Sequence, residues 1–394
     1  MKKGWETKRI SEIARHSLGK MLDKSKNKGE PKPYLRNLNV RWGEFDLSDV
    51  LKMRFLPEEA EKYTAVKGDV LICEGGYPGR AAIWDEDEPI YFQKALHRVR
   101  FHEPTRNKWF VYYLQFRDLE GTLKKHFNGA GIQHFTGEAL AQFEIPVPPL
   151  AEQQRIVGVL DEAFAGLATA QANAAKNLQN ARALFESHLQ SVFTQRGKGW
   201  VEKTLEEVST TFGRGKSKHR PRNAAHLYGG KYPFIQTGDI RNADHIITEY
   251  SQTYSDAGLA QSKLWPKGTI CITIAANIAE TAILGFDSCF PDSVIGVVAN
   301  PKETDVGFIE YLLQSFKARI QALGQGAAQA NINMGTFENE RFPFPPVAEQ
   351  KQIVAKLDAL ATETQRLARH YQQKQAALAA LKKSLLHDAF RGAL

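Results

Sequence analysis

The sequence predicts a mixed α/β protein of the α+β kind. We expect two sheet-and-helix domains separated by two long helices that pack as an antiparallel coiled coil, with pseudo-two-fold symmetry. A sixteen-residue phrase occurs twice, as PVPPLAEQQRIVGVLD (146–161) and PFPPVAEQKQIVAKLD (343–358). Short apolar runs broken by turn residues precede each copy, as is typical of strands. A long stretch without proline follows each copy, as a helix requires.

The duplication extends over nearly the whole chain. Matching pairs are GWETKRISEI (4–13) with GWVEKTLEEV (199–208), PYLRNLNVR (33–41) with PFIQTGDIR (233–241), KGDVLI (67–72) with KGTICI (267–272), and FVYYL (110–114) with FIEYL (308–312). From Ile145 and Phe342 onward the offset is a constant 197 residues. A period this long excludes a solenoid and indicates duplication of a whole domain with its connector.

The predicted domains follow from these repeats. They are a first module (1–147), a first helix (148–196), a second module (197–344) and a second helix (345–394). Strand signals such as DVLICEGG and SVIGVVAN lie in the modules. One helical pattern (108–127) interrupts the first module, and its partner (305–323) interrupts the second.

Both connectors have helix start and stop signals. Each begins at a proline pair, which the first turn of a helix tolerates, and places Glu152 or Glu349 at the positive end of the helix dipole. Gly197 and Gly392 are plausible C-terminal stops. Each helix should therefore have about 45 residues and a length of about 65 Å.

A seven-residue register predicts the seam between the two helices. The first helix is rich in alanine along this seam and the second in leucine, which is a good match of volumes. The seam residues are Ile156, Leu160, Ala163, Leu167, Ala170, Ala174, Ala181 and Leu184, facing Ile353, Leu357, Leu360, Leu367, Tyr371, Leu378, Leu381 and Leu385. If these seams pair, connectivity makes the helices antiparallel.

Charge and composition narrow the function. The net charge is +8, and residues 1–36 hold eleven Lys/Arg against four Asp/Glu. Residues 209–238 hold six Lys/Arg and no acid. Such clusters favour a polyanionic partner, although a solvated basic surface is the alternative. With no long apolar run, no signal-peptide pattern and three scattered cysteines, we expect a cytoplasmic protein.

No catalytic or metal-binding pattern emerges from the sequence. GRGKS (213–217) lacks the first glycine of a phosphate-binding loop, because Thr210 stands there. The eleven histidines show no ligand spacing. We therefore expect a binding protein with no catalytic residue, no metal and no cofactor of its own.

The repeated P-x-P-P-x-A-E-Q helices, the tryptophan-led module starts and YPFIQTGDI together resemble the specificity subunit of type I restriction-modification enzymes. The resemblance covers essentially the full chain. It implies two target recognition domains, each recognising one half of a split double-stranded DNA site, and helices that set the spacer. It also implies docking of two methyltransferase (modification) subunits and two motor/nuclease (restriction) subunits. AdoMet, ATP and Mg would belong to those partners, and the protein would be prokaryotic.

By position, the resemblance implies DNA contacts in both modules. The first module offers Lys20, Lys24, Lys26, Lys28, Arg36, Asn37, Arg41, Arg80, Gln133 and His134. The second offers Arg214, Lys216, Ser217, Lys218, Arg220, Thr237, Arg241, Asn277, Asn331 and Asn333. For each lysine, a solvated charge is the alternative interpretation. The two basic loops differ in sequence, so we expect the half-sites to differ.

Other functions stay open on sequence alone. The chain could be an interaction adaptor whose helices act as a scaffold, or an enzyme with an unrecognised site. It could also serve a methylation-only system without a motor subunit.

Overall fold

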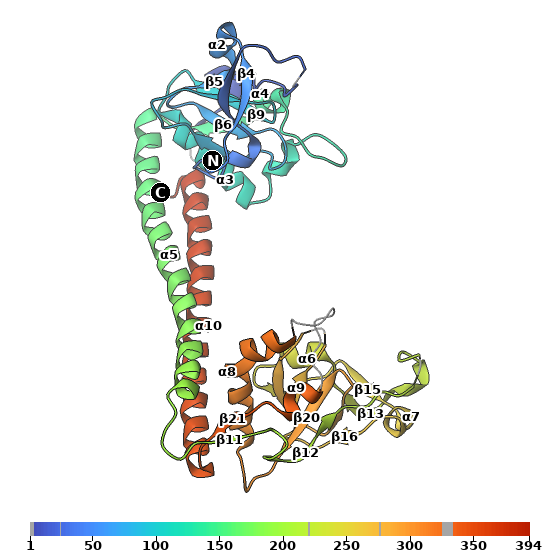
Figure 1. Cartoon of the computed structure of the whole chain (residues 1–394). Helices are drawn as coiled ribbons and strands as arrows, with labels where there is room; N and C mark the ends of the chain where they lie inside the picture. The colour runs from blue at the N-terminus through green and yellow to red at the C-terminus, as the bar shows by residue number, and fades with distance from the viewer. Residues whose placement is uncertain (1–3, 24, 220, 276, 325–333) are drawn as a thin grey trace. The chain divides into compact units, whose positions relative to one another are not determined.

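The computed structural model describes residues 4–23, 25–219, 221–275, 277–324 and 334–394 (Figure 1). These residues form two compact units. Unit 1 comprises Met1–Ala175 and Gln373–Leu394, and unit 2 comprises Lys176–Gln372. Two helices of 45 residues, α5 (Leu150–Thr194) and α10 (Val347–Arg391), each contribute one part to each unit. The predicted helix length is confirmed.

In unit 1, the first module contains two four-stranded sheets. The first has the order β2 (Ala14–Leu18), β9 (Leu96–Phe101), β6 (Val70–Cys73), β7 (Ala81–Ile83), and is antiparallel throughout. The second has the order β4 (Leu51–Phe55), β3 (Glu30–Leu35), β8 (Ile90–Phe92), β5 (Thr64–Ala65), with β3 and β8 parallel. Short helices α1 (Ile10–Ile13), α2 (Ala60–Tyr63) and α4 (Gly137–Gln142) accompany the longer α3 (Arg106–Leu119).

Unit 2 has the same plan in the second module. One sheet has the order β12 (Ser209–Arg214), β20 (Val294–Ala299), β17 (Ile270–Thr273), β18 (Thr281–Leu284), β14 (Ile246–Ile247). The other has the order β15 (Gln252–Tyr254), β13 (Tyr228–Phe234), β19 (Ser288–Cys289), β16 (Leu264–Trp265). The helices are α6 (Thr237–Asn242), α7 (Asp256–Ala260), α8 (Val306–Gly324) and α9 (Met334–Glu338). The predicted mixed sheet-and-helix class is confirmed.

The first and last strands of each module pair with each other just before the long helix begins. In unit 1, β1 (Glu6–Arg9) pairs antiparallel with β10 (Glu144–Val147). In unit 2, β11 (Val201–Lys203) pairs antiparallel with β21 (Phe342–Phe344). Both ends of a module are therefore held at the entrance to its own helix.

The tryptophan at each module start bonds to the glutamate in the first turn of that helix. Trp5 Nε1 donates to Glu152 Oε2 at 3.3 Å. Trp200 Nε1 donates to Glu349 Oε1 at 3.0 Å. These matching contacts explain why the glutamate of the A-E-Q phrase occurs twice.

The glutamine of the same phrase caps the proline pair. Gln153 Nε2 donates to the Pro148 carbonyl at 2.6 Å, and Gln350 Nε2 donates to the Pro345 carbonyl at 2.8 Å. Both glutamines are fully buried. Since a buried carbonyl without a partner is costly, the glutamine stabilises the turn into the helix. The repeated phrase is thus a local structural device inside a larger duplication.

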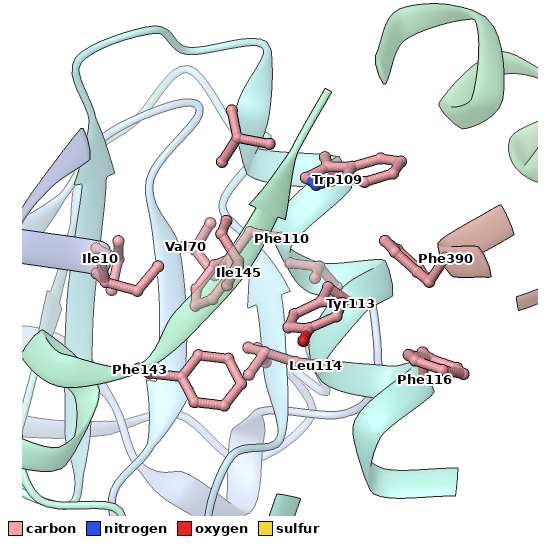
Figure 2. Packing of buried hydrophobic residues seen from close by; sticks show 14 of the residues in the cluster. Ile10, Val70, Trp109, Phe110, Tyr113, Leu114, Phe116, Phe143, Ile145 and Phe390 are labelled. Carbon is pink, nitrogen blue, oxygen red and sulfur yellow. The ribbon is translucent and has the colours of Figure 1, made fainter. Parts of the chain in front are cut away.

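In unit 1, the last turn of α10 completes the core of the first module. The Phe390 ring lies 4.6 Å from Trp109, 5.2 Å from Tyr113 and 5.3 Å from Phe116, measured between ring centroids (Figure 2). Ile156, from the beginning of α5, is buried in the same cluster. The start of α5 and the end of α10 therefore share one core.

In unit 2 the opposite ends come together. Phe193, near the end of α5, lies 5.4 Å from Phe308 of α8. Leu357, near the start of α10, is buried in that cluster. In each unit one helix contributes its beginning and the other its end, which is the antiparallel arrangement.

Two of the predicted seam residues are wrong. Leu184 is 51% exposed and Leu381 is 47% exposed. After Ala181 the buried stripe of α5 advances in steps of four residues through Phe185 and Leu189, because this part packs on α8 rather than only on α10. In α10, the neighbouring Lys382 faces α5 instead of Leu381.

Lys382 Nζ lies 4.9 Å from the centroid of the Phe164 ring of α5. Burial lowers the pKa of Lys382. The other predicted seam residues are buried or half-buried: Ile156, Leu160, Ala163, Leu167, Ala170, Ala174 and Ala181, with Ile353, Leu357, Leu360, Leu367, Tyr371, Leu378 and Leu385.

The sequence match of FVYYL with FIEYL is shifted by one residue. Tyr112 Oη donates to Asp161 Oδ1 at 2.5 Å, and Tyr311 Oη donates to Asp358 Oδ1 at 2.7 Å. These equivalent bonds pair Tyr112 with Tyr311, an offset of 311 − 112 = 199 rather than 198. The helix predicted over 108–127 also ends earlier, at Leu119, because Gly121 takes a left-handed conformation.

We predict that Phe390→Ala destabilises unit 1 by about 3–5 kcal/mol, since it removes a buried ring from a packed aromatic cluster. Chemical denaturation followed by tryptophan fluorescence would measure this. Leu381→Ala on the same helix is the matched control and should change stability by less than about 0.5 kcal/mol. Equal losses from both variants would contradict the packing described here.

Candidate nucleic-acid interface

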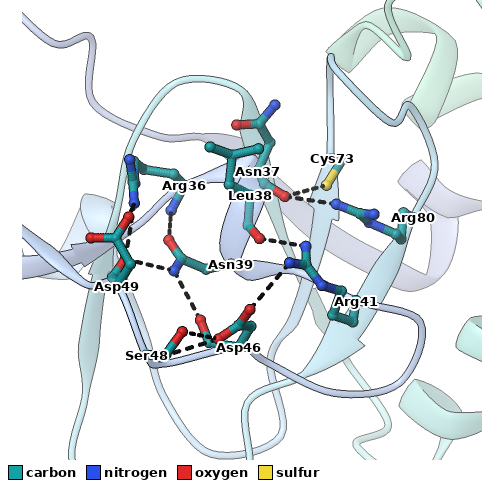
Figure 3. Close-up of polar contacts among 10 residues, drawn as sticks. All are labelled: Arg36, Asn37, Leu38, Asn39, Arg41, Asp46, Ser48, Asp49, Cys73 and Arg80. Atoms are coloured by element: carbon teal, nitrogen blue, oxygen red, sulfur yellow. Dashed lines mark hydrogen bonds and ion pairs between the residues drawn. The ribbon is translucent and has the colours of Figure 1, made fainter. Parts of the chain in front are cut away.

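In unit 1, the segment after β3 forms a compact loop built by its own polar side chains (Figure 3). The buried Asn39 donates through Nδ2 to the carbonyls of Asp46 (2.9 Å) and Asp49 (3.0 Å). Arg36 Nη2 donates to Asp49 Oδ2 at 2.6 Å and is largely covered. Arg36, predicted as a DNA contact, therefore serves to shape this loop.

Two further predicted residues join this loop to the β6–β7 hairpin. Asn37 Nδ2 donates to the Gly75 carbonyl at 3.1 Å. Arg80 Nη2 donates to the Asn37 carbonyl at 3.0 Å (Figure 3). Arg41 bonds within its own loop, to the Leu38 carbonyl and to Asp46. Asn37, Arg41 and Arg80 are all half-buried, so each retains some exposed surface.

The turn of the β6–β7 hairpin carries an exposed aromatic ring that sequence reasoning missed. Tyr77 is 57% exposed, and the Arg80 guanidinium carbon lies 4.0 Å from its ring centroid. A cavity of about 320 Å³ beside this pair is also lined by Trp42 and Phe127. The signal in the sequence was the GGYPG turn, where an aromatic residue follows two glycines.

A third loop stands beside the hairpin. The backbones of Asn128 and His134 exchange two hydrogen bonds of 2.8 Å, and Phe135 N donates to the Glu74 carbonyl at 2.7 Å. Gln133 is exposed, and the neighbouring Ile132 is 76% exposed. Asn37, Arg80 and His134 are therefore gathered at one place, and Gln133 lies next to them.

Lys20 does not fit the predicted role of a phosphate contact. Only 7% of it is exposed, and its Nζ lies 2.5 Å from Glu59 Oε2 and 3.0 Å from the Arg54 carbonyl. Burial would raise the pKa of Glu59, but hydrogen bonds from Lys20 and the Leu56 N–H outweigh it and lower that pKa. Lys20 is a structural ion-pair residue.

The other lysines of this loop differ from Lys20. Lys26 and Lys28 are exposed, and Lys26 Nζ lies 3.6 Å from Asp23. Lys24 lies outside the described residues. Lys26 and Lys28 are thus accessible to a polyanion.

In unit 2, an exposed basic run follows β12. Arg214, Lys216 and Lys218 are exposed, whereas Ser217 between them is only 7% exposed and points inward. Ser217 is therefore unsuited to the predicted DNA contact. Arg220 lies outside the described residues.

Lys263 joins this basic run and was missed because it is distant in sequence. Its Nζ lies 3.7 Å from the Trp265 ring, and the neighbouring Ser262 Oγ donates to the Lys216 carbonyl at 2.8 Å. Burial, and then the charge of Lys216, lower the pKa of Lys263. Lys263 thus adds a positive charge near Lys216.

Thr237, Arg241 and Asn277 lie at or beside the counterpart of the first hairpin. Arg241 Nη1 donates to Asn277 Oδ1 at 3.4 Å, and Thr237 is half-buried in the same helix as Arg241. Asn331 and Asn333 lie outside the described residues. The arrangement offers exposed positive charges for phosphates and a few amide or aromatic groups for bases.

The described ranges also bear on metal binding and on membrane insertion. Within them, no three His, Cys, Asp or Glu side chains gather in a group that could hold a metal ion. Nor does any helix in the same ranges combine the length and apolar character needed to cross a bilayer.

Comparisons with known proteins place these features in a family. A family model for the type I restriction modification DNA specificity domain matches residues 2–177 and 197–375. The putative type I restriction enzyme MjaX specificity subunit of Methanocaldococcus jannaschii is 24% identical over 347 residues, which are 79% of this chain and 77% of that protein. The StySPI specificity subunit of Salmonella potsdam is 21% identical over 392 residues, which are 92% of this chain and 82% of that protein.

Solved structures share the fold. A chain from work on complex assembly and conformational transition of a type I R-M system has a TM-score of 0.79 at 20% identity, with 100% of this chain and 99% of that chain covered. The HsdS subunit from Thermoanaerobacter tengcongensis has a TM-score of 0.63 at 20% identity, with 100% and 98% covered.

We predict that Lys20→Met lowers stability, whereas Lys28→Met lowers affinity for DNA. Lys20→Met leaves Glu59 without its buried partner and should destabilise the protein by about 3 kcal/mol. Lys28→Met should barely affect stability. If Lys28 contacts a phosphate, its loss weakens DNA binding and reduces the slope of log affinity against log salt by about one. Thermal unfolding and binding titrations at several salt concentrations would measure both. A stable Lys20→Met protein with a reduced salt slope would contradict this assignment.

Proposed function

The chain belongs to the type I restriction-modification DNA specificity family, and from that premise we propose that it is the non-catalytic subunit that selects the DNA sequence. Each module would recognise one half of a bipartite, asymmetric site on double-stranded DNA. The observation that carries this proposal is the equal architecture of the two modules combined with different side chains on their loops. Arg80 meets Tyr77 and Asn37 in unit 1, whereas Arg241 and Asn277 meet in unit 2.

The charge distribution supports DNA as the partner. Lys26 and Lys28 in unit 1, and Lys216 and Lys218 in unit 2, are exposed cations on loops. Phosphate contacts of this kind supply affinity and position a protein on the duplex without selecting a sequence. Sequence selection then falls to the few polar or aromatic groups that reach base edges.

We propose that the long helices have two roles. With 45 residues each, they span about 68 Å at 1.5 Å per residue, so their length would set the number of unspecified base pairs between half-sites. Their outward apolar residues would dock the modification subunits. Val159, Leu184 and Leu381 are each at least 40% exposed and would contribute to that contact.

Catalysis would lie in partner subunits. Two modification subunits would use AdoMet to methylate adenine, and two restriction subunits would use ATP and Mg to translocate and cleave. The complex would act in the prokaryotic cytoplasm, and a methylation-only system without the restriction subunits would use this chain in the same way.

Electrophoretic mobility shift with the modification subunit tests the proposal. We expect the complex to bind a duplex that carries its target sequence, with an affinity that falls steeply as the salt concentration increases. Binding that ignores salt, or no binding at all, would favour a protein-interaction adaptor instead.

We predict that lengthening both helices lengthens the spacer. Four residues inserted between Ala175 and Lys176 and four between Gln372 and Gln373 add about 6 Å to each helix at equivalent points of the pair. Methylome sequencing should then show a spacer longer by one or two base pairs, with both half-sites unchanged.

The control places the same four residues in the exposed loop at 85–88 of the first module. That variant should keep the original spacer. An unchanged spacer in the helix-lengthened variant would refute the role of the helices as a ruler.

A further inference from the structure

The hairpin β6–β7 of unit 1 has a counterpart of identical length in unit 2. In β6–β7, Val70 pairs with Ile83 and Ile72 with Ala81. In β17–β18, Ile270 pairs with Ile283 and Ile272 with Thr281. Every pair differs by 200 residues, so the turns at 74–80 and 274–280 correspond residue by residue.

The backbone hydrogen bonds that close the two turns are also the same. Cys73 N donates to the Arg80 carbonyl at 2.8 Å, and Gly79 N donates to the Cys73 carbonyl at 2.9 Å. In unit 2, Thr273 N donates to the Glu280 carbonyl at 2.9 Å, and Ala279 N donates to the Thr273 carbonyl at 2.8 Å. One backbone scaffold therefore presents whichever side chains the turn carries.

Those side chains differ in chemistry. Tyr77 corresponds to Asn277, and Arg80 corresponds to Glu280. In unit 1, Tyr77 is more than half exposed and held by the Arg80 guanidinium. In unit 2, Glu280 bonds to Lys317 Nζ of α8 at 2.8 Å.

The partner of Asn277 comes from α6, the short helix that follows β13. Arg241 Nη1 donates to Asn277 Oδ1, just as the Asn37 carbonyl accepts from Arg80 across the equivalent junction. Each turn is thus bonded to the segment that follows β3 or β13 in its own module. The first turn therefore presents an exposed aromatic ring beside the Arg80 guanidinium, where a partner can reach it.

We propose that residues 77 and 277 are specificity-determining residues that contact a base in their respective half-sites. The inference rests on the proposed function. Tyr77 would place its ring against a base face or a thymine methyl group. Asn277, with its oxygen occupied by Arg241, would present N–H donors to acceptors such as N7 and O6 of guanine.

The proposal is tested by Tyr77→Asn in the complete complex with its modification subunits, using single-molecule methylation mapping. We expect methylation at sites with the wild-type base to fall about tenfold or more, as for one mismatched base pair. The changed preference should affect one position in one half-site. The other half-site and the spacer should not change.

Two further variants exclude simple damage to the fold. Tyr77→Phe retains the ring and should retain the wild-type preference. Val66→Asn changes an exposed apolar residue that precedes β6, at the end of the strand away from the turn. This variant should leave both half-sites unchanged.

The outcomes separate this inference from the proposal on which it rests. If the wild-type complex methylates no bipartite motif, the proposed function is wrong. If the wild type does so and Tyr77→Asn lowers methylation uniformly without a new base preference, the specificity role of residue 77 is overturned.

Discussion

The architecture depends on how each module is fixed to the first turn of its own helix. A tryptophan indole donates to a glutamate in that turn, and a glutamine from the same turn binds the carbonyl of the first proline in the pair. These contacts occur where the first and last strands of the module pair. A buried polar group gains most when its partner is fixed, so the junction favours one orientation over many. Any function that requires a defined module direction depends on this junction.

The two units share their internal scaffold and differ in the side chains at their surface. Both units keep the same paired sheets, the same tyrosine-to-aspartate bond and the same hairpin closure. They differ where loops meet solvent, in Tyr77 and Arg80 on one side and Asn277 and Glu280 on the other. A chain built in this way can change the groups that it presents without disturbing its core.

Much of this arrangement was predictable from sequence, because repetition and long-range periodicity are global signals. The duplicated phrase, the helix length and the mixed class of the modules all follow from patterns that many residues share. The seam failed at Leu184 because a strict seven-residue repeat assumes one helical partner throughout, whereas α5 also packs on α8 after Ala181. It failed at Leu381 because the neighbouring Lys382 lies over the Phe164 ring of α5 instead. Lys20 failed for a different reason. Its charge placed it among the surface lysines, but Glu59, which buries it, is distant in sequence. Tyr77 was missed because exposure depends on the tertiary fold, and an aromatic residue is more often assigned to a core.

A chain that carries the second module twice, with residues 199–342 replacing residues 4–145, tests whether each module selects its own half-site. Because the junction contacts are equivalent, this chain should fold and assemble with its modification subunits. Single-molecule methylation mapping should then find a target in which one half-sequence occurs at both ends. Retention of the original asymmetric target would contradict the claim that each module independently selects its own half.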